Sequence, residues 1–175
     1  INVLSNAASA PSSEFDKIYQ DHFINYATAK YTPLADIPGN MLIISYGSFM
    51  DEMADFVAWK KQKGVPVEMV DVSTIGNASA IKTYVTNYYN TNGLVYLLLV
   101  GDNAQVPASS TSAGASDNNY GYIVGNDHYN DIFVGRFSAE NSSQLTTQVE
   151  RTIHYERDIA TNESWMENAI GSASS

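Results

Sequence analysis

Short apolar runs alternate with helical patterns between residues 41 and 100. Residues 41–44 and 94–100 are continuously apolar, which is typical of strands buried on both faces, and residues 65–70 alternate in the manner of a further strand. Between these runs, apolar positions recur at three- and four-residue spacing over residues 49–60 and 81–88, and this spacing predicts two helices. The pattern therefore predicts the element order strand, helix, strand, helix, strand for this region.

Residues suited to helix ends bracket both predicted helices. We expect Ser48 to cap the first helix and Gly64 to end it, and Asn77 and Gly93 to do the same for the second. Strands that alternate with helices over short connections form parallel sheets with right-handed crossovers. The predicted fold class is therefore α/β, with a parallel sheet between two helical layers.

The pattern is less regular after the strand at residues 94–100, which we expect to be central. A long surface loop is predicted where no period is visible, then two short strands joined by a hairpin or an arch, then a third helix. A last apolar stretch has the pattern of an opening strand that lacks a following element, so we expect the chain to be a fragment. The loop is expected at residues 103–119, the two short strands at 120–124 and 132–137, the third helix at 141–158 and the last apolar stretch at 169–173.

Residues 1–40 have a different character. They begin Ala/Ser-rich, contain a short amphipathic stretch from Phe15 to Phe23, and end in a turn-rich segment with two prolines, so we expect an arm with one short helix and a connector. The first residues lack a basic leader and a long apolar core, so no signal peptide is visible and we expect an already processed product.

The composition narrows the function classes. The chain has 175 residues, the size of one domain with or without a short appendage, and its net charge of −10 works against binding to nucleic acid or to an anionic membrane. No apolar run approaches the ~20 residues that span a bilayer. The sequence contains no Cys, which excludes disulfides, thiolate metal sites and a cysteine nucleophile within these residues.

Three aspartates are the strongest candidates for chemistry. Asp102 directly follows the strand at residues 94–100, at the strand end where parallel sheets bind ligands, although an Asp there is often only a turn residue. Asp127 and Asp131 are four residues apart in a loop, with Tyr129 between them. Two carboxylates and an intervening carbonyl, joined by Asp102, would form the oxygen-rich shell that Ca²⁺ prefers. The spacing does not match an EF-hand.

Other candidates favour structural roles. His128 shares no metal-ligand spacing with another His, so we interpret it as an exposed loop residue. No nucleophile elbow and no phosphate-binding glycine motif follows any predicted strand. The charged positions on the last helix predict a face exposed to solvent, and they are Glu150, Arg151, Glu156, Arg157 and Asp158. Four aromatic side chains predict packing in or around the core, and they are Trp59, Tyr84, Tyr88 and Tyr89.

Seven spaced blocks of the sequence resemble the N-terminal part of the catalytic domain of gingipains, secreted bacterial cysteine endopeptidases of caspase-like fold that cleave after Arg or Lys. The blocks are Phe56–Lys60, Lys63–Gly64, Tyr96–Asp102, Val106–Pro107, Tyr120–Gly121, Val134–Ser138 and Arg151–Arg157. Residues 124–130 are most similar to the arginine-cleaving branch. The resemblance runs from about Tyr31 to Ser175.

The resemblance implies which part of a larger precursor each segment of this chain would be. Residues 1–30 would be the tail of a propeptide, and residues 31–175 the first α/β half of a catalytic domain, whose catalytic Cys and His belong to the second half. The implied partners are that second half and protein substrates with a basic P1 residue, and the implied location is secreted or cell-surface. The family also implies structural calcium, with ligands at Asp102, the Val124 carbonyl, Asp127, the Tyr129 carbonyl and Asp131. The last of these positions can be Glu in relatives, and Asp131 is one methylene shorter.

In the arginine-cleaving branch the mature enzyme starts at a Tyr-Thr-Pro sequence like Tyr31-Thr32-Pro33, just after a basic residue. Lys30 precedes it here. We predict that cleavage between Lys30 and Tyr31 is slow or absent, and mass spectrometry of the active protein would test this. A dominant species that begins at Tyr31 would refute it.

Three other functions stay open from the sequence. One is a calcium-stiffened binding or adhesin module of the same fold without catalysis. Another is a related peptidase of the bacterial secretion system that removes C-terminal sorting domains. A nucleotide-binding regulator is compatible with the fold, but the phosphate-cradling glycines are missing.

Overall fold

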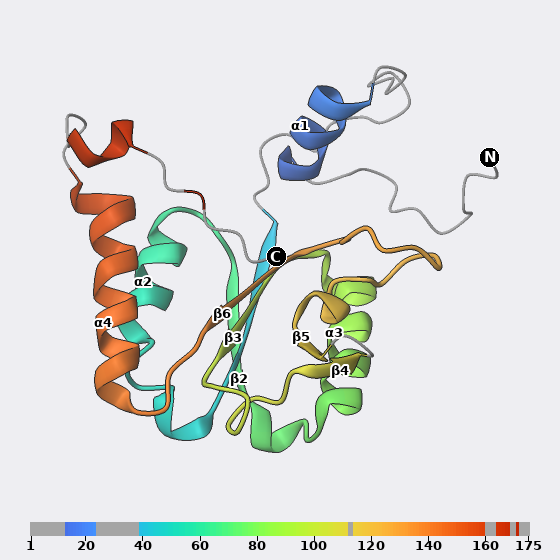
Figure 1. Cartoon of the computed structure of the whole chain (residues 1–175), viewed down its shortest axis with the longest axis horizontal. Coiled ribbons are helices and arrows are strands. Elements are labelled where there is room, and N and C mark those ends of the chain that lie inside the picture. Colours follow the sequence, from blue (N-terminus) through green and yellow to red (C-terminus); the bar gives the residue numbers. More distant parts are fainter. Residues whose placement is uncertain (1–12, 24–38, 112–113, 160–163, 169–170, 172–175) are drawn as a thin grey trace.

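Four parallel strands form the centre of the computed structural model (Figure 1). The structure describes residues 13–23, 39–111, 114–159, 164–168 and 171. The strands are β1 (Asn40–Ser45), β2 (Val67–Asp71), β3 (Leu94–Val100) and β6 (Phe133–Phe137), in the sheet order β2-β1-β3-β6. Both continuous apolar runs lie on the two inner strands, as their burial on both faces requires.

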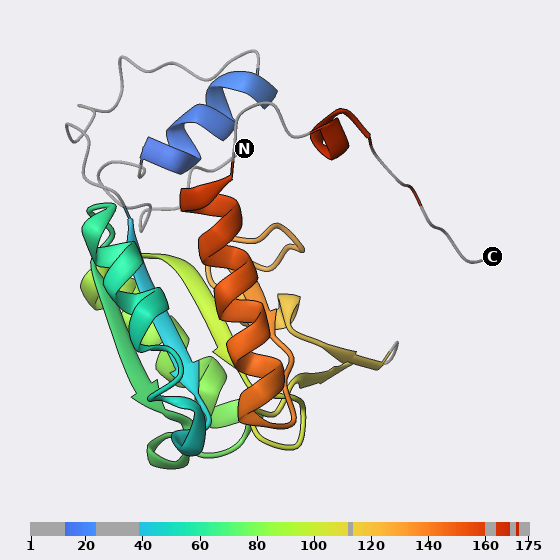
Figure 2. The ribbon, with the colours of Figure 1, turned by 90° about the vertical axis from the view of Figure 1, so that its left-hand side faces the viewer.

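Helices cover both faces of this sheet. Helix α2 (Ala54–Gln62) and helix α4 (Ser142–Ile153) pack side by side on one face, and α3 (Ala78–Asn92) covers the other (Figure 2). Successive strand residues point to opposite faces, so Ile43 joins the core under α2 and α4 while Ile44 joins the core under α3. The predicted three-layer α/β architecture is confirmed.

The second predicted helix has the predicted ends. Asn77 caps α3, since its side-chain oxygen accepts a hydrogen bond from the amide of Ala80 at 3.0 Å. Gly93 ends the helix in the left-handed conformation at φ +71°, which glycine adopts without strain.

The predicted Ser48 cap is wrong. Residues Gly47–Phe49 form a 3₁₀ helix instead, and α2 begins only at Ala54, with no side chain capping it. The amides of Phe49 and Met50 already bond to backbone carbonyls of this tight turn, so they do not need a side-chain acceptor. Gly64 does follow the helix with a positive φ of 85°, as predicted.

Two more predictions need correction. The loop at residues 103–119 contains a small antiparallel ribbon, β4 (Ser109–Thr111) and β5 (Gly114–Ser116). Residues 120–124 form no strand, because a 3₁₀ helix (Asn118–Tyr120) buries Tyr120 in the core beneath α3. Since residues 120–124 form no strand and β6 pairs with β3, the connector before β6 is an arch and not a hairpin.

The remaining elements flank this domain. Helix α1 (Ser13–His22) is the short helix expected in the N-terminal arm. Helix α4 continues as a π-helix (His154–Asp158), and single 3₁₀ turns occupy Val72–Thr74 and Ser164–Glu167. The strand predicted at residues 169–173 lies outside the described residues except for Gly171. Within the described part of the chain, every helix is too short or too polar to span a bilayer.

Candidate functional site

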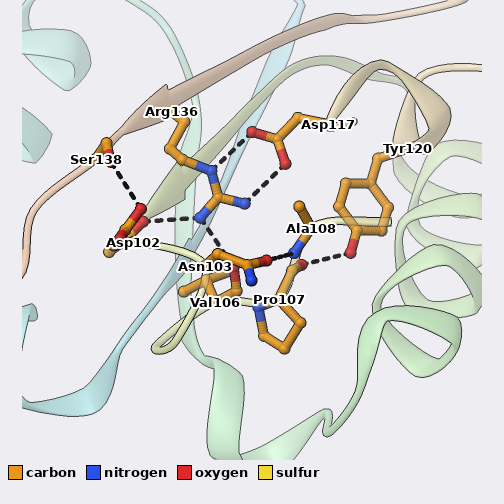
Figure 3. Close-up of polar contacts among 10 residues, drawn as sticks. Asp102, Asn103, Val106, Pro107, Ala108, Asp117, Tyr120, Arg136 and Ser138 are labelled. Carbon is orange, nitrogen blue, oxygen red and sulfur yellow. Dashed lines mark hydrogen bonds and ion pairs between the residues drawn. The ribbon is translucent and has the colours of Figure 1, made fainter. Parts of the chain in front are cut away.

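Arg136, on β6, ties together the loops at the carboxyl edge of the sheet (Figure 3). Its Nε and Nη2 atoms donate to the two carboxylate oxygens of Asp117 at 2.7 and 2.8 Å, a bidentate geometry. Its Nη1 atom donates to the carbonyl oxygens of Gly101 at 2.8 Å and Val106 at 2.9 Å. We call these four residues the Arg136 clamp. The clamp joins β6, the turn after β3 and the segment before the 3₁₀ helix at Tyr120.

Asp102 lies beside this clamp, directly after β3 (Figure 3). Its Oδ1 atom accepts a hydrogen bond from the Ser138 hydroxyl at 3.0 Å, and its amide donates to the carbonyl of Ala139 at 3.0 Å. The backbone amide of Asn103, the Ser138 hydroxyl and the charge of Arg136 lower the pKa of Asp102. The carboxylate is therefore ionised at neutral pH and is held against the chain that leaves β6.

The turn after β3 is also fixed from its outer side. Asn103 Oδ1 accepts from the amide of Ala108 at 2.8 Å, and the buried Tyr120 hydroxyl donates to the carbonyl of Pro107 at 2.6 Å (Figure 3). Burial raises the pKa of Tyr120 to about 12, so its hydroxyl stays protonated and remains a donor. Residues 101–108 are thus held in one arrangement by three side chains from two other segments, Arg136 and Ser138 at the end of β6 and Tyr120 in the 3₁₀ helix.

The arch between residues 121 and 131 is closed at its base by Asp131. The amide of Asp131 donates to the carbonyl of Gly121 at 2.9 Å. Its Oδ2 atom accepts from the amides of Ile123 at 2.7 Å and Val124 at 2.8 Å. Further along the arch, Asp127 Oδ1 accepts from the amide of Tyr129 at 3.1 Å, an Asx turn.

The predicted calcium ligands do not all converge. Asp131 precedes β6 and Asp102 follows β3, and the paired stretch between them runs from Tyr96 with Phe133 to Val100 with Phe137. That stretch covers four residue steps of ~3.3 Å, about 13 Å, whereas ligands of one Ca²⁺ lie within ~2.6 Å of the ion. Among the residues that the structure describes, no three His, Asp or Glu side chains are grouped to hold a metal. The structure therefore does not bring Asp102 to the arch.

The other four predicted ligands lie within the arch. Val124, Asp127, Tyr129 and Asp131 lie in one closed segment and offer only oxygen atoms, the donors that Ca²⁺ prefers. Only the Oδ2 atom of Asp131 takes hydrogen bonds from the described residues, so its Oδ1 atom can face an ion. A calcium site in the arch stays a prediction. His128, also in this arch, is exposed as expected and contacts the ring of Tyr122 edge-on.

Glu156 was wrongly assigned to a solvated face by its charge pattern. It lies in the π-helix after α4 and accepts hydrogen bonds from the Trp59 indole at 3.0 Å, Lys60 at 2.6 Å and Lys63 at 3.1 Å. It therefore braces α2 against α4. Arg136 was not predicted as a site residue, yet a charged residue within a short apolar strand is a signal for a buried ion pair.

The sheet with helices on both faces and braced loops at its carboxyl edge defines a three-layer α/β domain. The chain belongs to peptidase family C25, the gingipain family, whose model matches residues 34–175.

Relatives in Porphyromonas gingivalis agree with this assignment. The chain is 41% identical to Gingipain R2 over 179 residues, which cover 99% of this chain and 24% of that relative. It is 42% identical to Gingipain R1 over 166 residues, which cover 91% of this chain and 17% of that relative. The chain thus spans about a quarter or less of the length of these relatives.

A solved structure supports the fold as well. The crystal structure of the Arg-specific cysteine proteinase gingipain R matches with a TM-score of 0.71 and 44% identity, covering 77% of this chain and 33% of that one. A complex of the pro- and mature domains of RgpB from Porphyromonas gingivalis matches with a TM-score of 0.70 and 45% identity, covering 73% of this chain and 31% of that one.

Proposed function

We propose that this chain is the N-terminal half of the catalytic domain of a secreted or surface-bound gingipain-type cysteine endopeptidase that cleaves after Arg. The observation that carries the proposal is the match to family C25 over residues 34–175, together with 41% identity to Gingipain R2. Residues 1–30 would be the tail of a propeptide, and residues 31–175 the scaffold half. The sequence contains no Cys, so the nucleophile would come from another part of the protein.

The reaction of such an enzyme is acyl transfer. A thiolate attacks the scissile carbonyl, an imidazole moves the proton, and an acidic pocket selects the basic P1 side chain. None of these groups needs to come from this chain. Its contribution would be geometric, because catalytic side chains must be held to within about 0.5 Å of their productive positions.

The Arg136 clamp supports this scaffold role. Loops beyond the carboxyl ends of parallel strands form the ligand-binding edge of such sheets. The clamp fixes two of these loops to β6, with the Arg136 side chain only 13% exposed. A rigid edge of this kind is a suitable base for the second half of the domain and for its protein substrates.

We also propose that the arch binds one structural Ca²⁺ through the carbonyls of Val124 and Tyr129 and the carboxylates of Asp127 and Asp131. The ion would supply positive charge that offsets the two carboxylates and pins the arch. Because a ligand that binds only the folded state stabilises it, removal of Ca²⁺ should lower the melting temperature. If samples with EGTA and with millimolar Ca²⁺ melt at the same temperature, the calcium part of the proposal is wrong.

The enzymatic part is tested by hydrolysis of small chromogenic amides with Arg or Lys at P1. We expect the full-length protein to cleave the Arg substrate faster than the Lys substrate, and a thiol-alkylating reagent to abolish both activities. Faster cleavage of the Lys substrate would reject the specificity. Folded protein without activity on either substrate would favour the adhesin or the sorting-domain peptidase.

A further inference from the structure

Lys82 places an ammonium group beneath the base of the arch. It lies on α3, half-buried, and its Nζ atom donates to the carbonyl oxygens of Asn119 at 2.7 Å, Tyr120 at 3.5 Å and Tyr122. A lysine ammonium has three donors and no acceptor, so it can donate to all three carbonyls, with the longest and weakest contact to Tyr120. The contact joins α3 to a segment 37 to 40 residues further along the chain.

One peptide unit links Lys82 to Asp131. The carbonyl of Tyr122 accepts from the Lys82 ammonium, and the amide of the next residue, Ile123, donates to Asp131 Oδ2 at 2.7 Å. The peptide between Tyr122 and Ile123 therefore has a cation at its oxygen and an anion at its nitrogen. Hydrogen bonds in such a chain polarise and strengthen one another, so loss of one end weakens the other.

The two charges also affect each other directly. Burial lowers the pKa of Lys82, and the negative charge of Asp131 opposes this effect. The Asp131 carboxylate is thus held by two amides while a positive charge lies on the far side of the same peptide.

We propose that Lys82 is a positioning residue for the calcium arch: its ammonium orients the peptide between Tyr122 and Ile123, and this peptide in turn orients the Asp131 carboxylate toward the ion. The proposal rests on the calcium binding proposed above. Its consequence is that the arch is preorganised before Ca²⁺ arrives, so the ion does not have to order the loop on binding.

The test compares Lys82→Met, which keeps most of the aliphatic stem, and Lys82→Arg with the unmodified full-length protein. In EGTA, hydrogen exchange of peptides spanning residues 121–131 is measured by mass spectrometry. We expect Lys82→Met to speed exchange of this segment by about tenfold or more, and Lys82→Arg to restore part of the protection because a guanidinium can also donate to several carbonyls. Lys61→Met, at an exposed lysine on α2, is the control and should change nothing here.

Calcium affinity is then measured by titration calorimetry with Ca²⁺ alone. We expect the dissociation constant to rise 3- to 10-fold in Lys82→Met and less in Lys82→Arg. Unchanged exchange in Lys82→Met, or tighter Ca²⁺ binding, which would mean that the ammonium repels the ion, would overturn the proposal. If the unmodified protein binds no Ca²⁺ but Lys82→Met still exchanges faster, the calcium function fails while Lys82 remains a structural anchor of the arch.

Discussion

Replacing Arg136 with Met should loosen the carboxyl edge of the sheet while leaving the core intact. The guanidinium makes four hydrogen bonds, two to Asp117 and one each to the carbonyls of Gly101 and Val106. Removal of one member of a buried ion pair costs about 3–5 kcal/mol because the partner charge is left uncompensated. The Asp117 side chain is 25% exposed and would regain some water, so we expect the lower end, about 3 kcal/mol.

Hydrogen exchange of peptides spanning residues 101–108 measures this cost locally. The amide of Val106 donates to the carbonyl of Asp102 at 2.8 Å, and the Arg136 clamp holds this turn closed. Since each ~1.4 kcal/mol changes an opening equilibrium tenfold, about 3 kcal/mol predicts exchange roughly 100-fold faster. Arg136→Lys should recover only part of the protection, because an ammonium cannot form the bidentate pair.

Arg151→Met provides the matched control, since this arginine is exposed on α4 and its removal should leave the exchange of residues 101–108 unchanged. If Arg136→Met accelerates that exchange less than about tenfold, the clamp contributes under ~1.4 kcal/mol. The turn after β3 would then be held by Tyr120 and Asn103 without it, and the scaffold role assigned to Arg136 would be wrong.

Three further predictions follow from single side chains. Glu156→Gln should lower the free energy of unfolding by about 1–2 kcal/mol, because it removes the charge that holds Lys60 and Lys63; an unchanged melting temperature would contradict this. Burial tends to raise the pKa of Glu156, but the hydrogen bonds from Lys60, Lys63 and Trp59 outweigh burial and lower this pKa from its usual value of 4.5. The stability that this carboxylate contributes is therefore present above pH 4.5 and is lost as the pH falls through the lowered pKa. The difference in melting temperature between unmodified protein and Glu156→Gln should accordingly shrink below pH 4.5, and a difference that grows there would refute the sign. Tyr120→Phe should cost about 1–2 kcal/mol in denaturant unfolding, because the carbonyl of Pro107 loses its buried donor at 2.6 Å, and a change under ~0.5 kcal/mol would show that the bond is dispensable.

The sheet was predictable because burial on both faces leaves a simple trace in the sequence. Residues 41–44 and 94–100 are apolar at every position, and in the structure they lie on the two inner strands, covered by helices on both sides. The ends of α3 were predictable for a local reason as well. Asn77 and Gly93 act through their own side chain or backbone conformation and need no distant partner.

The errors arose where distant contacts decide the structure. Residues 120–124 have a strand-like composition, yet Tyr120 is buried against α3 and the Lys82 ammonium donates to the carbonyls of Tyr120 and Tyr122. These contacts come from a helix about 40 residues earlier, which local patterns do not reveal. Glu156 was misassigned for the same reason, since its partners on α2 are more than 90 residues away.

The candidate site shows what spacing along the chain can and cannot predict. The four arch positions are close in sequence, and one closed loop does contain them. Asp102 was added because it follows a strand, but which edge of the sheet a residue occupies depends on strand direction and register. The parallel pairing of β3 with β6 places the start of β6 at the opposite end from Asp102.

The same geometry bears on the N-terminal arm. Within the described residues, α1 lies at the amino edge of the sheet, where Phe15 stacks on Phe133 with ring centroids 5.1 Å apart and Glu14 accepts from the amide of Gly39 at 3.4 Å (Figure 1). Phe133 in turn stacks on Tyr96, so the contact reaches the first residue of β6 and the residue of β3 that pairs with it. Ligands of parallel sheets bind beyond the carboxyl ends of the strands, at the opposite edge. Helix α1 therefore contacts the edge of the sheet opposite to the edge at which the Arg136 clamp lies.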